Sequence, residues 1–478
     1  MYPSGLRLEL TPQGADALQA SALLAAAPEI VDLHSIYFDT PDLDLYNAGH
    51  SLRIRRMHSA WVQAVRSRGA AAVMYVRNVN GATPVLDGHT PVQEILGDKA
   101  HLLAPQFEVR AERRIWTVTD EEMVASLVLD RGEIAAAGGT TPVCDVSLEL
   151  RQGTPHALFN LARRIDSIAL VRLGTESRQD KGFRLRESPP PAFKAEAIHL
   201  NDGMTAAESF QAIALACVRQ FRLNETLLLA NRGRDALHQS RVALRRFRSA
   251  LTIFRPLFGD AREGGPGREL RWLAAEIGEA RNLDVLLQSV PDGELHKPLL
   301  AAREAEYDRV LRVLESERAR TLMLSAMEWI TGGPWLHDAE ARDIRNTPAR
   351  DFAIDALGRL HLKARKRGRK LRTISDEQRH QLRKTAKKLR YGAEFHASLF
   401  DSAKQRRRRK TFLVQLEQLQ DQLGALNDIV TAPATLERLG VLDDPQAKAL
   451  LTPEARAELI RDAATGFRRL MNAKVFWR

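Results

Sequence analysis

The chain has 478 residues, enough for roughly two to four ordinary domains, and its 44% apolar content is typical of a packed globular protein. Its net charge of +11 and isoelectric point near 9.8 indicate a polyanionic partner, such as nucleic acid, an anionic membrane surface or a phosphate polymer. The first residues lack the basic and apolar regions of a signal peptide, and no run of about eighteen apolar residues occurs. We therefore expect a soluble, cytoplasmic protein rather than a secreted or membrane-spanning one.

Short strands are expected along residues 1 to about 186, and three of them alternate apolar with polar residues. The polar faces carry Arg7 and Glu9 in the first strand, Arg53 and Arg55 in the second, and Asp145, Ser147 and Glu149 in the third. Strands that collect charges on one face suggest a barrel with a charged lumen. A lumen with several arginines suits an anion such as a phosphate chain.

The proline-rich stretch that begins at Ser188 can continue neither a strand nor a helix, and we interpret it as a linker. From about Thr205 onward, Leu, Ala, Arg and Glu recur at the three- and four-residue spacing of amphipathic helices, which predicts an all-helical second half. The expected organisation is a strand-rich domain at 1–187, a linker at 188–202 and a helical domain at 203–478. Cys144 and Cys217 lie far apart in apolar contexts, so free thiols are expected rather than a disulfide.

Two segments of the helical half repeat each other. The sequence HQSRVALRRFRSAL, which begins at His238, is echoed by HQLRKTAKKLRYGA at His380, 142 residues later. In each copy, basic side chains at i, i+3, i+7 and i+10 fall on one helix face. They are His238, Arg241, Arg245 and Arg248 in the first copy, and His380, Arg383, Lys387 and Arg390 in the second. The repetition predicts two related helical bundles.

These basic stripes favour a polyanion-binding role over a merely solvated face. Like charges at this spacing repel by a few tenths of a kcal/mol per pair, and a polyanion lying along the stripe would reverse that cost. Residues 359–410 concentrate the charge, with 20 Lys or Arg against four acids, so binding should depend strongly on salt. The run at 406–410 points all round a helix, and we assign it a supporting or solvated role.

The scarcity of aromatic residues in the helical half helps to decide which kind of polyanion it binds. Aromatic residues are scarce near the basic stretches, whereas a single-stranded nucleic-acid site would stack bases on such residues. Phosphate without bases fits better. The pairs Asn427 with Asp428 and Asn282 with Asp284 are interpreted as structural, capping a helix or orienting an Arg.

The helical half resembles a CHAD domain, a conserved-histidine alpha-helical domain. The resemblance rests on the paired His-led helices and on ELRWL (269–273), GEARNLD (278–284), KLRYGAE (388–394) and LQDQLGALND (419–428). It implies two pseudo-symmetric four-helix bundles with a basic groove that binds inorganic polyphosphate. The implied binding residues are His238, Arg241, Arg245, Arg246, Arg248, His380, Arg383, Lys384, Lys387, Lys388 and Arg390. The second copy is the more basic and should dominate the affinity.

The first half resembles the CYTH, or triphosphate tunnel, family. The resemblance rests on YFDTPD (37–42), AGHSLRIRR (48–56), WVQAVR (61–66), LDRGEI (129–134) and DKGFR (180–184). It implies an antiparallel eight-stranded β-tunnel or barrel, so the whole chain would be an α+β multidomain protein. The implied phosphate-binding residues are Arg7, Arg53, Arg55, Arg66, Arg113, Arg131, Arg178 and Lys181.

Family members that hydrolyse triphosphate hold Mg²⁺ or Mn²⁺ with glutamates of a Glu-x-Glu-x-Lys opening strand. Aligned with that signature, the Lys position is Arg7 and the two Glu positions are Pro3 and Gly5, while Ser147 takes the middle place of a later Glu-x-Glu-x-Glu strand. Neither Pro nor Gly offers a side-chain oxygen, so we expect hydrolysis to be impaired. The domain would remain a phosphate holder or a relic barrel whose arginines pair with its own acids.

The sequence thus predicts a cytoplasmic polyphosphate-binding protein, associated with polyphosphate granules, that needs no cofactor for binding. The first alternative is an inorganic triphosphatase whose Mg²⁺ or Mn²⁺ is held by Asp145, Glu149, Glu9 and Asp130. The second alternative is a nucleic-acid-binding protein, supported by net charge and little else.

Overall fold

The computed structural model describes residues 5–57, 60–67, 74–186, 188–259, 264–290, 293–442, 444 and 453–478. The chain divides into two compact units, Met1–Pro190 and Pro191–Arg478, and each is described by itself. Pro3, which takes one of the signature carboxylate positions, lies outside the described residues.

The first unit is built on one antiparallel sheet in the order β5-β4-β3-β2-β6-β7-β8-β1-β9. The strands are β1 (Gly5–Glu9), β2 (Glu29–Asp39), β3 (His50–Met57), β4 (Ala60–Ser67), β5 (Met74–Val79), β6 (Ala104–Thr119), β7 (Met123–Ala136), β8 (Gly139–Gly153) and β9 (Arg172–Leu173). Within the described residues the sheet has nine strands and is not closed, which corrects the expected eight-stranded barrel. On the side away from β8, β1 pairs with β9 through Leu8 with Leu173 and Glu9 with Arg172.

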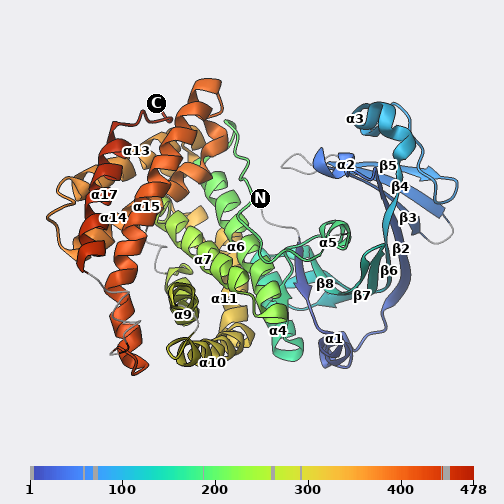
Figure 1. Ribbon diagram of the computed structural model, residues 1–478. Coiled ribbons are helices and arrows are strands. Elements are labelled where there is room, and N and C mark those ends of the chain that lie inside the picture. Colours follow the sequence, from blue (N-terminus) through green and yellow to red (C-terminus); the bar gives the residue numbers. More distant parts are fainter. Residues whose placement is uncertain are drawn as a thin grey trace. The chain divides into compact units, whose positions relative to one another are not determined.

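The alternation predicted for β1, β3 and β8 separates the two faces of this sheet. Short helices cover the apolar face: α1 (Pro12–Gln19) packs on α4 (Pro155–Ala169), and α2 (Asp44–Asn47) and α3 (Val92–Leu96) lie near Leu52 and Ile54 of β3. Figure 1 shows that the sheet curves and that α5 (Arg178–Arg184) lies on its concave side. Phe183 of α5 packs edge-on against Phe107 of β6. The polar residues of the strands therefore face a concave surface partly filled by α5.

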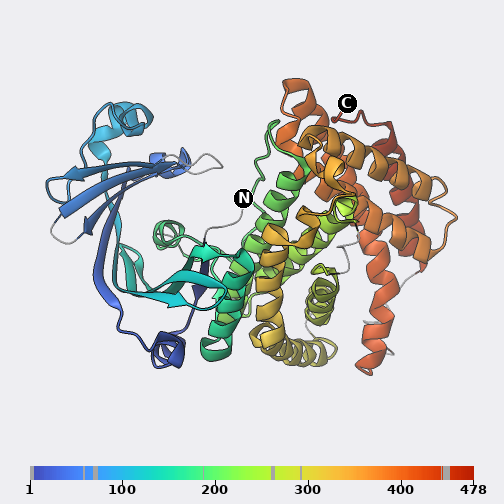
Figure 2. The ribbon, with the colours of Figure 1, turned by 180° about the vertical axis from the view of Figure 1, so that it is seen from behind.

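The second unit is helical, as predicted. Its helices are α6 (Ala206–Asn231), α7 (Arg234–Ile253), α8 (Gly267–Glu276), α9 (Gly278–Ser289), α10 (His296–Glu315), α11 (Glu317–Gly332), α12 (Arg342–Asn346), α13 (Ala349–Gly368), α14 (Asp376–Phe395), α15 (Ala403–Arg438) and α17 (Pro453–Asn472). Capping boxes start α6 at Thr205 and α14 at Ser375. Figure 2 shows the second unit from behind, with α13, α14, α15 and α17, coloured orange to red, on the side that holds the C-terminus.

The two repeated segments form α7 and α14, which pack against each other. Around α7 lie α6, α8 and α9, and around α14 lie α13 and α15. The centre of the unit thus brings the two His-led helices together, so that side chains 142 residues apart in sequence become neighbours.

The segment between the units has neither helix nor strand from 188 to 200, and its later part packs on the helical unit. The backbone N–H of Phe193 donates to Asn224 Oδ1 at 2.9 Å, and Asn224 Nδ2 donates to the Phe193 carbonyl at 2.8 Å. Ile198 and Leu200 are buried. These contacts fix residues 193–200 to α6 and to the neighbourhood of Ser398, whose Oγ accepts from the Leu200 N–H.

Cys144 and Cys217 are both free thiols, the first half-buried and the second buried. Within the described residues, every helix is too short or too polar to cross a bilayer.

Candidate functional site

A groove of about 950 Å³ opens in the helical unit between α7, α8 and α14. Its wall carries nine Lys and Arg side chains together with His380, and no Asp or Glu of the described residues lines it. The cations are Arg245, Arg248, Arg255, Arg268, Arg271, Arg383, Lys384, Lys387 and Lys388. The groove therefore collects positive charge from both sequence copies and from one further helix.

Seven residues that the sequence predicted line this groove: Arg245, Arg248, His380, Arg383, Lys384, Lys387 and Lys388. Three more were missed, namely Arg255, which follows α7, and Arg268 and Arg271 of α8. The i, i+3 spacing of Arg268 and Arg271 gave a signal, but only the packing of α8 on α7 brings them to the wall.

The groove cations crowd one another without compensating acids on the wall. Burial first, and then the neighbouring Arg245 and Arg383, lower the pKa of Lys387 to about 6, while Asp428 acts in the opposite direction. The pKa values of Arg248 and Lys388 are also lowered by burial and by surrounding cations. An anion in the groove would remove this repulsion.

Arg383 carries a buried hydrogen-bond donor, which is a second feature that favours an anion in the groove. Its Nε is buried and finds no hydrogen-bond acceptor among the described residues. A buried donor without an acceptor costs about 1–3 kcal/mol, and an oxyanion would satisfy it.

His238 and Arg241 lie beside the groove rather than on its wall. Arg241 donates to the Gly278 carbonyl, and its pKa is lowered to about 10 by burial and by Arg245 and Arg281. Burial, together with Arg281 and Arg245, lowers the pKa of His238 to about 4. Both residues therefore belong to the same cationic cluster, with Arg281 as a member that the sequence did not single out.

His380 is held in place from α15. Its Nδ1 lies 2.7 Å from Asn427 Oδ1, and because an amide oxygen only accepts, Nδ1 carries the hydrogen of this bond. Asn427 thus has the predicted structural role, although it orients a His and not an Arg. Asp284 orients an Arg as predicted, since it accepts from Arg303 Nε at 2.8 Å and also from the Tyr307 hydroxyl at 3.0 Å.

Arg246 and Arg390 do not line the groove, which corrects their assignment to the binding set. Arg246 is 5% exposed, donates to Glu394 Oε2 at 2.6 Å and stacks over Phe395. Arg390 donates to the other oxygen of Glu394 at 2.8 Å and lies 3.3 Å from Glu417. Helical spacing places Arg390 on the basic face of its helix and the family resemblance adds Arg246, but both guanidinium groups point to Glu394 and bond to it.

In the first unit, strand register places the other predicted cluster on the concave face. Arg7 lies opposite Ser147, Glu9 opposite Asp145, and Asp145 opposite Asp130. Arg113 lies opposite Asp130 and forms a two-pronged ion pair with it, at 2.8 and 2.9 Å.

Two cations of α5 reach the same acids. Arg178 bonds to Asp130 and Asp145, and Lys181 Nζ lies 2.7 Å from Glu9 Oε1. Burial alone would raise the pKa of Asp130, but Arg113 and Arg178 hold it below its usual range. Arg113, Arg178 and Lys181 are therefore brought together as predicted, and each is paired with an acid.

The remaining predicted cations of the concave face have no acidic partner among the described residues. Arg55 Nε donates to Ser35 Oγ at 3.3 Å, and burial with the nearby Arg53 and Arg113 lowers its pKa to about 10. Arg53 lies opposite Tyr37, and Arg66 of β4, which is exposed, lies opposite Ser51. Arg7 Nε is buried without a hydrogen-bond acceptor among the described residues. These arginines form the part of the face that can hold an anion.

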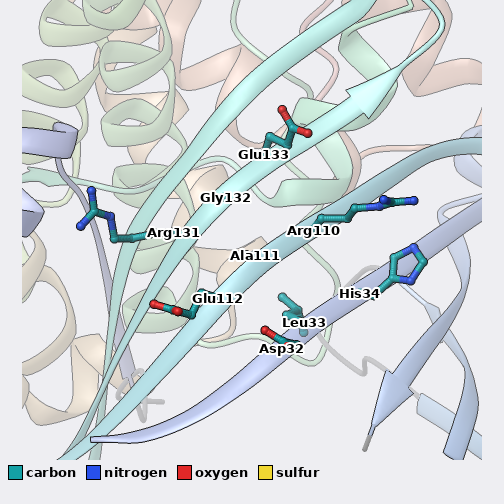
Figure 3. A pocket seen from close by; sticks show the side chains of 9 residues that line it. All are labelled: Asp32, Leu33, His34, Arg110, Ala111, Glu112, Arg131, Gly132 and Glu133. Carbon is teal, nitrogen blue, oxygen red and sulfur yellow. The ribbon is translucent and has the colours of Figure 1, made fainter. Parts of the chain in front are cut away.

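Arg131 lies on the other face of the sheet and not with this cluster. It follows Asp130 by one residue and pairs across the strands with Glu112, so the period of two turns it away, and it donates to Asp16 at 2.6 Å. Figure 3 shows it at the edge of a shallow pocket of about 700 Å³ over β2, β6 and β7, which Glu112, Arg110 and Glu133 also line.

The carboxylates of the concave face do not fit a divalent metal. Glu9, Asp130 and Asp145 each pair with Arg or Lys, and Glu149 is half exposed and lies 3.2 Å from Arg151. Among the described residues, no group of three or more His, Cys, Asp or Glu is placed to hold a metal ion. A Cβ at Gly5 would lie 2.7 Å from the Leu148 carbonyl oxygen, so this signature position has no room for a glutamate side chain.

Comparison with known proteins also finds two domains. The CYTH domain family matches residues 6–182, and the CHAD domain family matches residues 212–437. An inorganic triphosphatase of Haemophilus influenzae is 21% identical over 160 residues, which are 32% of this chain and 46% of that protein, so the match spans about half of the relative's length.

Two solved structures are also similar. The crystal structure of the CHAD domain from the plant Ricinus communis is 26% identical, with a TM-score of 0.48, and the match covers 58% of this chain and 96% of that one. A Hippeastrum protein described as having a dominant triphosphatase activity is 18% identical, with a TM-score of 0.26, over 39% of this chain and 97% of that one. The chain contains a CYTH domain followed by a CHAD domain.

Proposed function

We propose that the protein binds inorganic polyphosphate in the groove of its CHAD domain. The observation that carries the proposal is the wall of nine Lys and Arg side chains without an acid among the described residues. Such a wall attracts an anion of high linear charge and gains from the release of its counterions. Binding of this kind requires no cofactor, and association with polyphosphate granules would follow from it.

The groove offers little to nucleobases. Its aromatic residues are Phe258 and Trp329, which are 1% and 6% exposed, so neither presents a ring face for stacking. A partner that is all phosphate therefore suits the wall better than single-stranded DNA or RNA. Competition between labelled long-chain polyphosphate and RNA or duplex DNA at physiological salt tests this, and a preference for the nucleic acid would overturn the proposal.

A matched pair of variants tests the place of binding. Reversing Arg383 and Lys387 to Glu should lower polyphosphate affinity at least about a hundredfold, because both face the groove and each reversal adds a repulsive charge. Reversing Arg407 and Arg408 of α15 changes the charge equally at positions that do not line the groove. If the two pairs of substitutions weaken binding equally, the groove is not the site.

For the CYTH domain we propose phosphate holding without efficient hydrolysis. The arginines at positions 7, 53 and 55 face the concave surface without acidic partners among the described residues, whereas Asp130 and Asp145 form ion pairs with Arg178. A second candidate function, metal-dependent triphosphatase activity, is favoured by the Haemophilus influenzae relative, although the three carboxylates of this face are already paired with cations. Phosphate release from tripolyphosphate with Mg²⁺ or Mn²⁺ distinguishes them, since turnover above about 1 s⁻¹ is enzyme-like.

A further inference from the structure

A third basic stripe runs along α13, outside the two repeated helices. Arg359, Lys363 and Arg367 recur at i, i+4 and i+8 and therefore share one helix face. Arg359 and Lys363 are exposed, and neither forms an ion pair within the part of the chain that the structure describes. The opposite side of α13 is packed, with Gly368 against Phe467 and His361 against Trp477. Arg359 and Lys363 are thus open, unpaired cations of this face, and Arg367, which is half-buried, continues the face toward α14.

The stripe on α13 meets the groove at α14. Arg367 Nη1 donates to the Gln381 carbonyl at 3.0 Å and to Thr385 Oγ1 at 2.6 Å, so the guanidinium lies on α14. Lys384 and Lys388, which flank Thr385, line the groove. Burial, and after it Lys363 and Arg367, lower the pKa of Lys388, and Arg248 on the groove wall adds to the effect. Lys388 therefore stands between the two sets of cations.

We propose that this α13 stripe (Arg359, Lys363 and Arg367) is a second track for polyphosphate, along which a long chain leaves the groove, so that the protein selects long chains over short ones. The inference rests on the proposed function of the groove. Each phosphate that a cation of the stripe neutralises releases counterions, so a chain long enough to reach the stripe gains affinity that a chain confined to the groove does not. The gain is additive in phosphates along one continuous ligand.

The test compares two probes on the full chain. Long-chain polyphosphate can occupy the groove and the stripe together, whereas tripolyphosphate has only three phosphate groups and neutralises few cations at a time. The part of tripolyphosphate binding that Lys387→Met removes reports the groove alone, free of any contribution from the CYTH domain. The double variant Arg359→Gln with Lys363→Gln should weaken long-chain binding about tenfold at low salt and leave that groove component unchanged. The slope of log affinity against log salt for the long chain should fall by about one to two.

The control is Arg407→Gln with Arg408→Gln, which removes the same charge from α15. Its neighbour Arg409 donates to the Ala397 and Phe400 carbonyls beyond the last turn of α14, at the end away from His380 and Lys384. Thermal unfolding of both double variants should match the parent, because the substituted side chains of α13 are exposed.

Each other outcome decides against one of the two claims. If the parent binds neither probe, the proposed function fails. If both double variants weaken the long chain equally, general charge and not the α13 stripe sets the affinity, and the inference fails. If the α13 variant loses RNA or anionic-vesicle binding while polyphosphate binding persists, the stripe serves another polyanion, which also overturns the inference.

Discussion

Lys387 shows at the scale of one residue how the groove is prepared for an anion. Arg245 and Arg241 of α7 and Arg383 of α14 lower its pKa after burial, and Asp428 of α15 opposes them. With a pKa of about 6, most Lys387 side chains of the empty groove are uncharged at neutral pH. A bound phosphate chain favours the charged form and raises this pKa.

Polyphosphate affinity should therefore fall as the pH rises from about 6. Binding takes up a proton wherever the bound pKa exceeds the pH and the free pKa lies below it, so the affinity loses up to about tenfold per pH unit in that window. Titration calorimetry in buffers of different ionisation enthalpy measures the proton uptake directly. Lys387→Met should bind more weakly and lose most of this pH dependence, and an unchanged profile in that variant would contradict the assignment.

The same shift has the opposite consequence for the empty protein. The unfolded chain keeps Lys387 charged to about pH 10, whereas the folded chain releases its proton near pH 6, so its contribution makes folding more favourable as the pH rises between these values. Lys387→Met removes this cost and should raise the urea midpoint at pH 7 in the absence of polyphosphate. A lowered midpoint would show that the ammonium group is stabilised by contacts in the fold.

Arg245 and Arg246 are neighbours in sequence with opposite roles. Arg246→Met leaves Glu394 without one of its two cations and should cost about 2–3 kcal/mol of unfolding free energy, below the full value for a buried pair because Glu394 keeps Arg390. Its polyphosphate affinity should stay within about twofold of the parent. Arg245→Gln should show the reverse, weaker binding with unchanged urea stability, and the two measurements together check the division.

At the scale of elements, the period of each strand or helix decides how much the sequence reveals. The alternation in β1, β3 and β8 separates the charged from the apolar face as predicted. Helical spacing predicted one basic face for each of α7 and α14, whereas a groove between them was implied only by the resemblance to CHAD domains. Arg131 was misplaced because it was assigned from the family resemblance without its strand register: it follows Asp130 directly, and adjacent strand residues face opposite ways. The two-residue β9 has no period to detect, so neither the ninth strand nor the open edge could be predicted.

Residues that enter a site only through tertiary packing were also beyond the sequence. Arg271 lies on the groove wall because α8 packs on α7, and no local pattern carries that information. Arg246 and Arg390 show the opposite case. Both were predicted to bind the anion in the groove, but each instead donates to Glu394 of α14.

The opening strand gives a prediction at this scale. Gly5→Glu restores a signature carboxylate, but its Cβ would meet the Leu148 carbonyl oxygen at 2.7 Å, so β1 must shift away from β8. We expect a loss of about 1–3 kcal/mol of unfolding free energy and no gain of metal-dependent phosphate release. Ser147→Glu, on the neighbouring strand and facing Arg7, is the control and should fold normally. Triphosphatase activity in Gly5→Glu would show that the carboxylate position can be rebuilt.

At the scale of the whole molecule, the two domains present different anion-binding chemistry. The CHAD groove has cations without acids on its wall, whereas three cations on the concave face of the CYTH domain, Arg113, Arg178 and Lys181, pair with Asp130, Asp145 and Glu9. The groove should therefore respond strongly to ionic strength, and the concave face less so, because its own carboxylates already neutralise part of the charge.

Ligand protection should separate the two domains within the full chain. A ligand at about a hundred times its dissociation constant stabilises the domain that binds it by about 2.7 kcal/mol. We expect Arg55→Gln to abolish protection by tripolyphosphate that survives Lys387→Met, and to leave protection by long-chain polyphosphate intact. Scanning calorimetry of the single and double variants measures this, and loss of long-chain protection in Arg55→Gln would place that ligand in the CYTH domain.

The pairing of α7 with α14 has a consequence for how the helical unit unfolds. One wall of the groove comes from the first sequence copy and the other from the second, and the two walls repel until a ligand bridges them. A polyphosphate chain lying across both copies must be released before the copies separate. Long-chain polyphosphate should therefore slow unfolding of the helical unit far more than it speeds folding. The ligand would thus give the unit kinetic stability by holding the two sequence copies together.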